Sequence, residues 1–325
     1  MSDIRLFRLT GTRAAEITGS ASALEKPLQT LIEANLGPLL AIRFLATEYP
    51  TGKVHGGRID TLGLDENDCP VILEYKRSTG ENVINQGLYY LDWLLDHRAE
   101  FEQLVRKQLG AQAAEAVDWD APRLVCIAAD FTKFDAHAVK QIGRNIDLVR
   151  YRRFGADLLL LELVNAVTAD ASDSGRPVGA VAPNRSSSRR KVGAVALHGP
   201  SHDPKSRPDW LPQLAPETVQ LFESLDRYIR SLGDDVQRKD QKKYVAYKRL
   251  RNFATAVAQP KAKNIRLFLH LDPANYLIDG QFLRDVGQLG HWGTGALEIL
   301  LENHEHLKRA APYLEAAYEG SKGAR

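Results

Sequence analysis

The chain has 325 residues, of which 44% are hydrophobic and 26% charged, with a formal net charge of +2; this length favours two domains, and so small a charge excludes nucleic-acid binding through global charge alone. The two cysteines, Cys69 and Cys126, lie far apart, which argues against a disulfide framework or a zinc knuckle and favours a reducing compartment. No run of residues reaches the length of a transmembrane helix and the first residues lack an apolar signal core, so a cytoplasmic protein without a membrane partner is expected.

Strand and helix patterns alternate over the first 165 residues. Apolar patterns predict strands over residues 4–9, 42–49 and 123–129, a strand pair over 146–164, and a hairpin over 58–77. Helices are predicted over residues 22–40, 81–110 (in one or two pieces) and 135–145, with Ser22 as the first N-cap and Gly37 as the first stop. Residues 1–165 are therefore predicted to form an α/β domain, a mixed sheet flanked by helices.

Residues 166–209 are predicted to be a flexible linker, because small residues, Pro, Gly and Ser dominate there without a helical or strand period. Its basic cluster, Arg185–Lys191, has two open interpretations, a phosphate contact or a solvated charged linker. Beyond the linker, helices are predicted over 215–233, 279–289 and 303–320, with three strands over 242–272 and one over 296–300. Residues 210–325 are therefore predicted to form a small α+β domain.

Three charged residues stand in the predicted hairpin over residues 58–77, where side chains would otherwise be apolar. Glu74 and Lys76 are two apart, so they share one face of their strand. A turn symmetric about Asn67 would place Asp60 opposite Glu74, with Cβ atoms roughly 5 Å apart, although a β-bulge would shift this pairing. Two carboxylates this close repel each other unless a cation lies between them.

Carboxylate oxygens beside a lysine suit one kind of chemistry. Asp60 and Glu74 could hold Mg²⁺ or Mn²⁺, which lowers the pKa of a bound water and polarises a phosphoryl oxygen. Lys76 could orient that water or neutralise charge in the transition state, and the substrate implied is a phosphodiester. The alternative is purely structural: ion pairs between Lys76 and Glu74 and between Arg58 and Asp60.

Residues outside the hairpin add to this pattern. Gln86 and Tyr90 lie four apart on the next predicted helix, hence on one face, and Trp93 continues that face. Glu25, on the first predicted helix, could add another carboxylate. Each residue also has a structural interpretation, as a core aromatic or as a helix cap.

Taken together, these residues resemble the PD-(D/E)xK nuclease superfamily, within a restriction-endonuclease-like fold. The matching elements are Asp60, the run Glu74-Tyr75-Lys76, and the segment from Gln86 to Tyr90, which fits the Q-x-x-x-Y motif of the RecB-like branch. The Glu25 helix resembles the helix that supplies an extra acidic residue in many members. Ile59 stands where proline precedes the aspartate in the name-giving motif.

The resemblance implies roles for these residues. Asp60 and Glu74 would be metal ligands, with the Tyr75 carbonyl as a third. Lys76 would position the water, and Gln86 and Tyr90 would contact the substrate or brace the site. Glu25 would be the extra acidic residue. The nearest resemblance is to NucS-like endonuclease domains, which implies branched or single-stranded DNA as substrate. Related nucleases are often dimers, so a homodimer is a further expectation.

The second domain has its own cluster. Aromatic and basic residues alternate over Tyr244–Phe253, as on surfaces that stack bases and pair phosphates, and the candidates there are Tyr247, Lys248 and Arg251. His291 and Trp292 lie between glycines in a loop whose backbone could approach a ligand closely. The alternative is a small core with a basic rim. Residues 215–320 resemble a bacterial domain of unknown function, sometimes labelled "predicted transport protein".

The leading prediction is an enzyme, a Mg²⁺- or Mn²⁺-dependent nuclease that acts on DNA in repair or in defence against foreign DNA. Two other classes stay open. One is a non-catalytic nucleic-acid-binding module that keeps the nuclease fold, and the other is a protein-interaction module that acts through the second domain. Residues Asp60, Glu74 and Lys76 favour the enzyme, because degenerate relatives usually lose one of the three.

Overall fold

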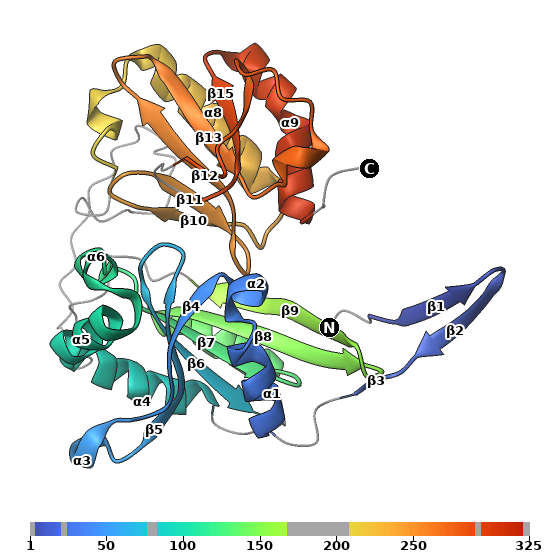
Figure 1. The fold of residues 1–325 in the computed structure, drawn as a ribbon, viewed down its shortest axis with the longest axis vertical. Helices are drawn as coiled ribbons and strands as arrows, with labels where there is room; N and C mark the ends of the chain where they lie inside the picture. Colours follow the sequence, from blue (N-terminus) through green and yellow to red (C-terminus); the bar gives the residue numbers. More distant parts are fainter. Residues whose placement is uncertain (1–3, 21–24, 77–82, 168–207, 290–293, 321–325) are drawn as a thin grey trace, which may run out of the picture.

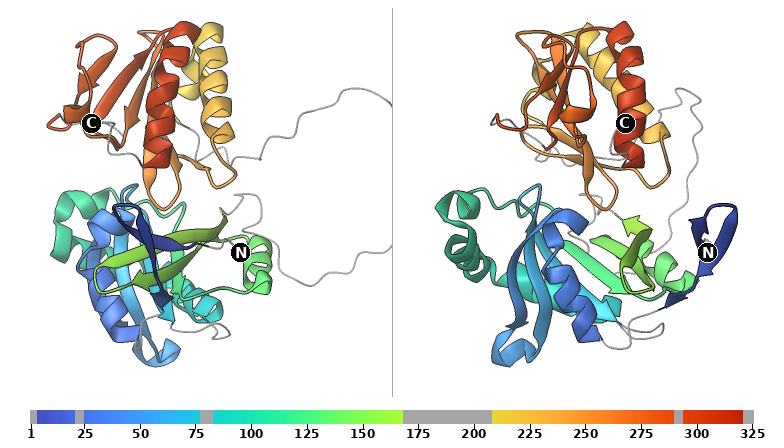
Figure 2. Two further views of the ribbon diagram at one scale, coloured as in Figure 1. Left: turned by 90° about the vertical axis from the view of Figure 1, so that its right-hand side faces the viewer. Right: turned by 45° about the vertical axis from the view of Figure 1, so that its right-hand side comes forward.

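The computed structural model describes residues 4–20, 25–76, 83–167, 208–289 and 294–320. Within these residues the chain forms two bodies stacked one on the other, each built around its own sheet (Figures 1 and 2). A separate two-stranded hairpin, β1 (Leu6–Thr10) and β2 (Arg13–Ile17), projects from the first body (Figure 1). The predicted fold class, a mixed sheet flanked by helices followed by an α+β part, is confirmed.

The N-terminal sheet has the order β3-β8-β7-β6-β5-β4, and β9 also pairs with β8. Strand β7 runs parallel to both of its neighbours, β6 and β8, whereas all the other pairs are antiparallel. The strands are β3 (Gly19–Ser20), β4 (Ile42–Pro50), β5 (Arg58–Asp65), β6 (Pro70–Lys76), β7 (Arg123–Ala128), β8 (Asn145–Phe154) and β9 (Leu158–Val167). Every residue of β7 is buried, as expected for a parallel strand covered on both faces.

Helices cover both faces of this sheet. One face packs against α1 (Glu25–Glu33) and α2 (Leu36–Leu40), through side chains such as Leu28 and Ile32. The other face packs against α4 (Val83–Asp96) and α5 (Arg98–Leu109), through side chains such as Trp93. The shorter helices are α3 (Gly52–His55), α6 (Ala111–Glu115), α7 (Lys133–Ala138) and the 3₁₀ turn η1 (Val139–Gln141).

Two details of the first domain differ from the sequence-based expectation. Gly37 does not end the first helix; it lies inside α2, and the break falls at residues 34–35. A second short helix, α2, begins at Leu36 after this break. It ends at Ala41, whose backbone is left-handed (φ 54°) and caps the helix. The predicted helix over 135–145 is shorter than expected, since α7 ends at Ala138, the 3₁₀ turn η1 follows, and β8 begins at Asn145. Ser22 and most of the predicted linker lie outside the described residues.

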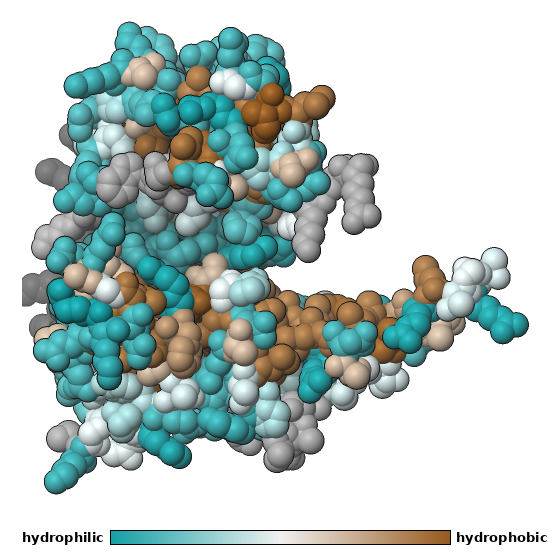
Figure 3. Space-filling view, viewed as in Figure 1, coloured by the Kyte–Doolittle hydropathy of each residue, from teal (hydrophilic) through white to brown (hydrophobic). Residues whose placement is uncertain are grey.

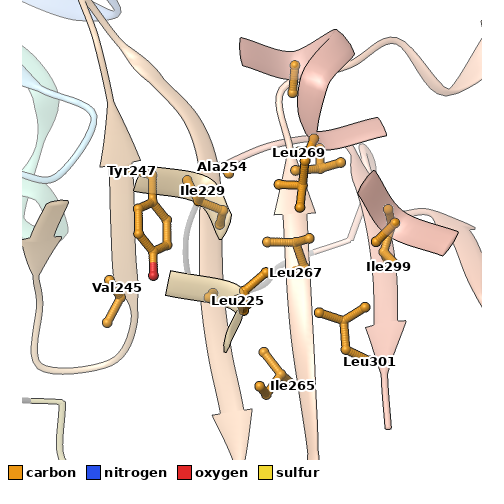
Figure 4. Close-up of a cluster of buried hydrophobic side chains, with 14 of the residues drawn as sticks. Leu225, Ile229, Val245, Tyr247, Ala254, Ile265, Leu267, Leu269, Ile299 and Leu301 are labelled. Atoms are coloured by element: carbon orange, nitrogen blue, oxygen red, sulfur yellow. The ribbon is translucent and has the colours of Figure 1, made fainter. Parts of the chain in front are cut away.

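The C-terminal sheet has the order β10-β11-β12-β13-β15-β14, and all its pairs are antiparallel. Its strands are β10 (Gln237–Asp240), β11 (Val245–Lys248), β12 (Asn252–Gln259), β13 (Asn264–Leu269), β14 (Leu283–Asp285) and β15 (Leu297–Leu301). Two amphipathic helices, α8 (Pro216–Ser231) and α9 (His304–Glu319), cover this sheet, and short 3₁₀ turns lie at Leu211–Gln213 and Pro273–Asn275. Figure 4 shows Leu225 and Ile229 of α8 packed against the strands.

The helix predicted over residues 279–289 is wrong, because strand β14 occupies this segment. The Asp279 carboxylate accepts hydrogen bonds from the backbone N–H groups of Gln281 (2.9 Å), Phe282 (2.8 Å) and Leu283 (2.9 Å). These bonds form a turn that delivers Leu283 to its partner Ile299 on β15. The local turn chemistry therefore overrides the helical spacing of the apolar residues.

The two domains meet at the turn of the β5–β6 hairpin. The side chains of this turn contact β10, β12 and the start of β11. Asn67 is 3% exposed, and its Oδ1 accepts hydrogen bonds from Asn252 Nδ2 (2.8 Å) and the Tyr244 hydroxyl (3.0 Å). The Glu66 carboxylate accepts a hydrogen bond from the backbone N–H of Asn252. Cys69 is free and buried beside Lys239. The sequence identified this turn but not its contact with the second domain.

Glu66 makes the contact between the domains sensitive to pH. Burial raises the pKa of this carboxyl to about 7. Between its ordinary range and pH 7 the folded chain therefore binds more protons than the unfolded chain, and the free energy of unfolding falls as the pH rises. Glu66→Gln mimics the protonated form. We therefore expect the variant to keep up to about 3 kcal/mol of the unfolding free energy that the wild type loses over this pH range. Melting temperatures of both proteins from pH 5 to 8 test it, and parallel curves would contradict it.

No helix in the described part of the chain is long and apolar enough to cross a membrane. The expected homodimer and the cytoplasmic location stay predictions.

Candidate active site

The register of the β5–β6 hairpin is the predicted one. Thr61 pairs with Leu73 and Gly63 with Val71, so the hairpin is symmetric about Asn67. Asp60 and Glu74 are the next residues beyond the Thr61–Leu73 pair, and the side chain of each accepts a hydrogen bond from the other strand. The backbone N–H of Asp60 donates to Glu74 Oε1 (3.2 Å), and the backbone N–H of Tyr75 donates to Asp60 Oδ2 (3.0 Å). The two carboxylates are therefore brought together, as the sequence indicates.

Both carboxyl groups are held where ionisation is costly. Glu74 is 0% exposed, and its Oε2 is buried without a hydrogen-bond partner among the described residues. Burial, reinforced by the charge of Asp60, raises the pKa of Glu74 to about 9. Burial also raises the pKa of Asp60, although the Tyr75 N–H bond and Lys76 oppose this. A cation between the carboxylates would satisfy the orphan oxygen and remove the repulsion.

The donor set fits a hard divalent cation. Among the described residues no three His, Cys, Asp or Glu side chains converge as metal ligands. The protein would therefore supply the two carboxylates of Asp60 and Glu74, and water would complete the coordination, which is how Mg²⁺ is commonly held. The third predicted ligand, the main-chain carbonyl of Tyr75, stays a prediction. The Tyr75 side chain is 1% exposed, and its hydroxyl accepts a hydrogen bond from Thr61 Oγ1 (3.3 Å), which fixes this part of β6.

Lys76 and Glu25 lie next to each other at the edge of this pair. Lys76 Nζ is 3.8 Å from Glu25 Oε2, and the lysine side chain is 19% exposed. The charge of Lys76 acts on both Asp60 and Glu74. The purely structural alternative placed Arg58 beside Asp60, but Arg58 Nη1 lies 3.5 Å from Glu48 Oε2. A cationic group therefore borders the buried carboxylates and remains partly open to solvent.

Two further residues border Asp60 that the sequence reasoning missed. Glu48 on β4 lies beside Asp60 between two paired positions of the β4–β5 ladder and has a left-handed backbone (φ 49°). Its charge adds to the raised pKa of Asp60, and Lys26 (2.9 Å) holds its carboxylate. Gln29 on α1 is 4% exposed and donates to the Asp60 carbonyl (2.8 Å). Because Gln29 lies four residues after Glu25, the helical spacing could have identified it.

Gln86 and Tyr90 brace the start of β5. Tyr90 is 6% exposed, and its hydroxyl accepts hydrogen bonds from the backbone N–H of Arg58 (3.3 Å) and from Gln86 Nε2 (3.5 Å). The ring of Tyr90 packs directly on Gly57. Both predicted residues therefore hold the start of the strand that carries Asp60.

Gly57 leaves no room for a larger side chain. A Cβ at this position would lie 2.6 Å from the Tyr90 hydroxyl oxygen and 2.7 Å from a ring carbon. We expect Gly57→Ala to destabilise the fold by about 1–3 kcal/mol, because the buried Tyr90 has to shift. Gly37→Ala is the matched control, since nothing lies within 4 Å of its Cβ. Chemical denaturation of both variants measures the difference, and equal midpoints would refute the close packing.

Two of the candidates for nucleic-acid binding in the second domain, Tyr247 and Lys248, are buried. Tyr247 is 0% exposed, its hydroxyl donates to Asp226 Oδ1 (2.9 Å), and Figure 4 shows its ring among core side chains. Lys248 is 7% exposed and lies 3.7 Å from Asp147 of the first domain. Base stacking by Tyr247 and phosphate pairing by Lys248 are therefore wrong. Arg251 is partly exposed, whereas His291 and Trp292 lie outside the described residues.

Comparisons with known proteins match the second domain to a described family model. A family model described as "Domain of unknown function (DUF5655)" matches residues 212–321. An uncharacterized protein of Haemophilus influenzae is 27% identical over 308 residues, which cover 94% of this chain and 96% of that protein. The similarity therefore spans both domains together.

Solved structures match part of this chain. A repair endonuclease from Pyrococcus abyssi is 17% identical and aligns over 41% of this chain and 50% of that chain, with a TM-score of 0.26. An EndoMS–dsDNA complex is 18% identical over 40% of this chain and 47% of that chain, with a TM-score of 0.22. The chain spans about half the length of these structures, and at such TM-scores neither informs on its activity.

Proposed function

We propose that the protein is a metal-dependent nuclease that hydrolyses phosphodiester bonds, with DNA as its substrate. The observation that carries the proposal is the buried pair of Asp60 and Glu74, in which one carboxylate oxygen has no hydrogen-bond partner in the part of the chain that the structure describes and both pKa values are raised. A structural ion pair would have satisfied these groups with a cationic side chain at hydrogen-bond distance. The pair instead suits a cation from solvent.

The residues around the pair have separable roles. Asp60 and Glu74 would hold Mg²⁺ or Mn²⁺, which when bound activates a water and polarises a phosphoryl oxygen. Lys76 is partly open to solvent and cationic, so it can orient that water or neutralise charge that develops on the phosphate. Gln29 and Tyr90 position Asp60 through hydrogen bonds to the backbone of β5. Glu25 sets the position of the Lys76 ammonium group.

The choice of DNA rests on the order of the motif residues, which resembles that of NucS-like and RecB-like nuclease domains. Branched or single-stranded DNA is the substrate that this resemblance favours, and repair or defence is the setting. The alternative function is a non-catalytic module that binds nucleic acid or protein and keeps the nuclease fold. The intact Lys76 and the unsatisfied Glu74 oxygen favour the enzyme, because a binding module needs neither.

A cleavage assay tests the proposal. Labelled single-stranded, duplex and flap DNA and single-stranded RNA are incubated with Mg²⁺, with Mn²⁺ or with EDTA. We expect cleavage of at least one DNA substrate that needs the metal and is lost in Asp60→Ala and Lys76→Ala. Lys53→Ala, at an exposed lysine of α3, is the matched control and should cleave normally. Cleavage that survives both substitutions would reject this site, and no cleavage of any substrate would favour the binding module.

A further inference from the structure

A groove of about 400 Å³ lies between the first domain and the C-terminal domain, on the side of β9. Residues Leu160–Leu163 of β9 form one wall. Arg251 and His270 are on the C-terminal domain side, and Tyr318 and Glu319 at the end of α9 close the groove. The volume is that of a small-ligand site, and such sites occur preferentially where domains meet.

The β9 wall of the groove is suited to contacts with a ligand. In the described part of the chain β9 pairs with β8 alone, so its outer edge presents backbone groups without a sheet partner. Hydrophobic side chains gather in a band over β8 and β9 (Figure 3). This wall therefore combines an apolar surface with free backbone donors and acceptors, which fits a ligand that has a flat apolar part and a polar part.

The opposite wall carries two basic side chains, Arg251 and His270. Within the described ranges Arg251 makes one long hydrogen bond, from Nη1 to the Pro38 carbonyl (3.4 Å), so most of its five donors have no partner there. The imidazole of His270 has no hydrogen-bond partner among the described residues. Partial burial, followed by the positive charge of Arg251, lowers the pKa of His270. An anion between the two groups would favour the protonated imidazole and so oppose this shift.

The other charged groups of the groove are already engaged or are unfavourable to an anion. Arg249 is bound to Asp235 (2.6 Å) and stacks over the Tyr318 ring at 4.7 Å. Glu162 is bound to Arg150 (3.0 Å). Glu319 lies at the C-terminal end of α9, where the helix dipole is negative, so that end repels an anion. The anion therefore belongs at the end formed by Arg251 and His270.

We propose that this groove binds a phosphate ester of a nucleic-acid strand, with the phosphate between Arg251 and His270 and the sugar or base against β9. As a second contact for the strand, away from Asp60 and Glu74, it rests on the proposed function. A free nucleotide offers the same chemistry. The proposal assigns the C-terminal domain a role in substrate binding through Arg251, the accessible member of the basic and aromatic cluster that the sequence singled out.

Binding without cleavage tests the proposal. The full chain is titrated with a fluorescent dT₁₂ strand in EDTA at several salt concentrations, beside Arg251→Ala and the control Arg227→Ala, an exposed arginine of α8. We expect Arg251→Ala to weaken binding about tenfold and to reduce the salt slope by about 0.7, the loss of one phosphate contact on a single strand. The control should bind like the wild type. Equal binding by both variants would overturn the strand assignment.

Two further arms separate the sources of the phosphate and the role of His270. If dTMP binding depends on Arg251 and strand binding does not, the groove is a nucleotide site and the strand assignment fails. If neither depends on Arg251, the groove is not a phosphate site. Strand binding should strengthen as the pH falls from 8 to 5.5, because protonated His270 attracts the anion, and His270→Gln should remove this dependence. These readouts do not require cleavage, so they stand or fall independently of the Asp60 assays.

Discussion

Glu74→Gln is expected to reduce DNA cleavage by about a thousandfold or more while it raises the stability of the metal-free protein. The substitution removes the charge that would hold the cation, and a metal contributes several kcal/mol to charge stabilisation in such reactions. The same charge is costly without the metal, because Glu74 is 0% exposed and its pKa is raised to about 9. A glutamine amide can instead donate a hydrogen bond to the adjacent Asp60 carboxylate.

Cleavage rates and melting temperatures of the two proteins, both measured at pH 7.5, check this expectation. The gain in stability should be about 1–3 kcal/mol, since the wild-type carboxyl must take up a proton to stay buried. Glu115→Gln, at an exposed residue at the end of α6, controls for the change in net charge. A variant that is inactive but less stable than wild type would show that Glu74 is a structural residue rather than a metal ligand.

Arg123→Met is expected to destabilise the protein by about 3–5 kcal/mol, the cost of leaving a buried charge without its partner. Arg123 is 4% exposed; its Nε lies 2.5 Å from Asp147 Oδ2, and its Nη1 lies 3.9 Å from Asp65 Oδ2. A further nitrogen donates to the Leu250 carbonyl of the second domain (3.3 Å). The substitution therefore leaves two buried carboxylates and weakens the contact between the domains.

Chemical denaturation of Arg123→Met measures this cost, with Arg144→Met, at an exposed arginine before β8, as the control. The double variant Arg123→Met, Asp147→Asn should be more stable than Arg123→Met alone, because the amide removes one of the unpaired charges. If the loss of unfolding free energy in the double variant equals the sum of the losses in Arg123→Met and Asp147→Asn, the two side chains do not interact. The buried ion pair would then not be what stabilises this region.

The hairpin was predictable because its register depends on local chemistry alone. A symmetric turn about Asn67 fixes the pairing of Thr61 with Leu73, and the side-chain period of two then places Asp60 and Glu74 on one side. The helix that carries Gln86 and Tyr90 follows from apolar periodicity. The elements of the candidate site could therefore be read from residues that lie close together in the sequence.

The rest depended on long-range packing. Glu48 reaches Asp60 from β4, and no local pattern distinguishes it from other polar residues, whereas the helical spacing from Glu25 does mark Gln29 on α1. Tyr247 and Lys248 looked like a binding surface because aromatic and basic residues alternate there. In the structure their strand is buried between α8 and the first domain, and an ion pair with Asp147 satisfies the lysine. Burial of a charged residue at a domain contact leaves no signal in its own segment.

Binding of Mn²⁺ to the full chain, measured by isothermal titration calorimetry, tests the central claim most directly. We predict saturable binding by the wild type that is lost in Asp60→Asn and in Glu74→Gln. Asp92→Asn, at a side chain of α4 that is 73% exposed, should bind like the wild type. No binding by the wild type, or equal binding by all four proteins, would contradict the assignment of Asp60 and Glu74 as the metal site.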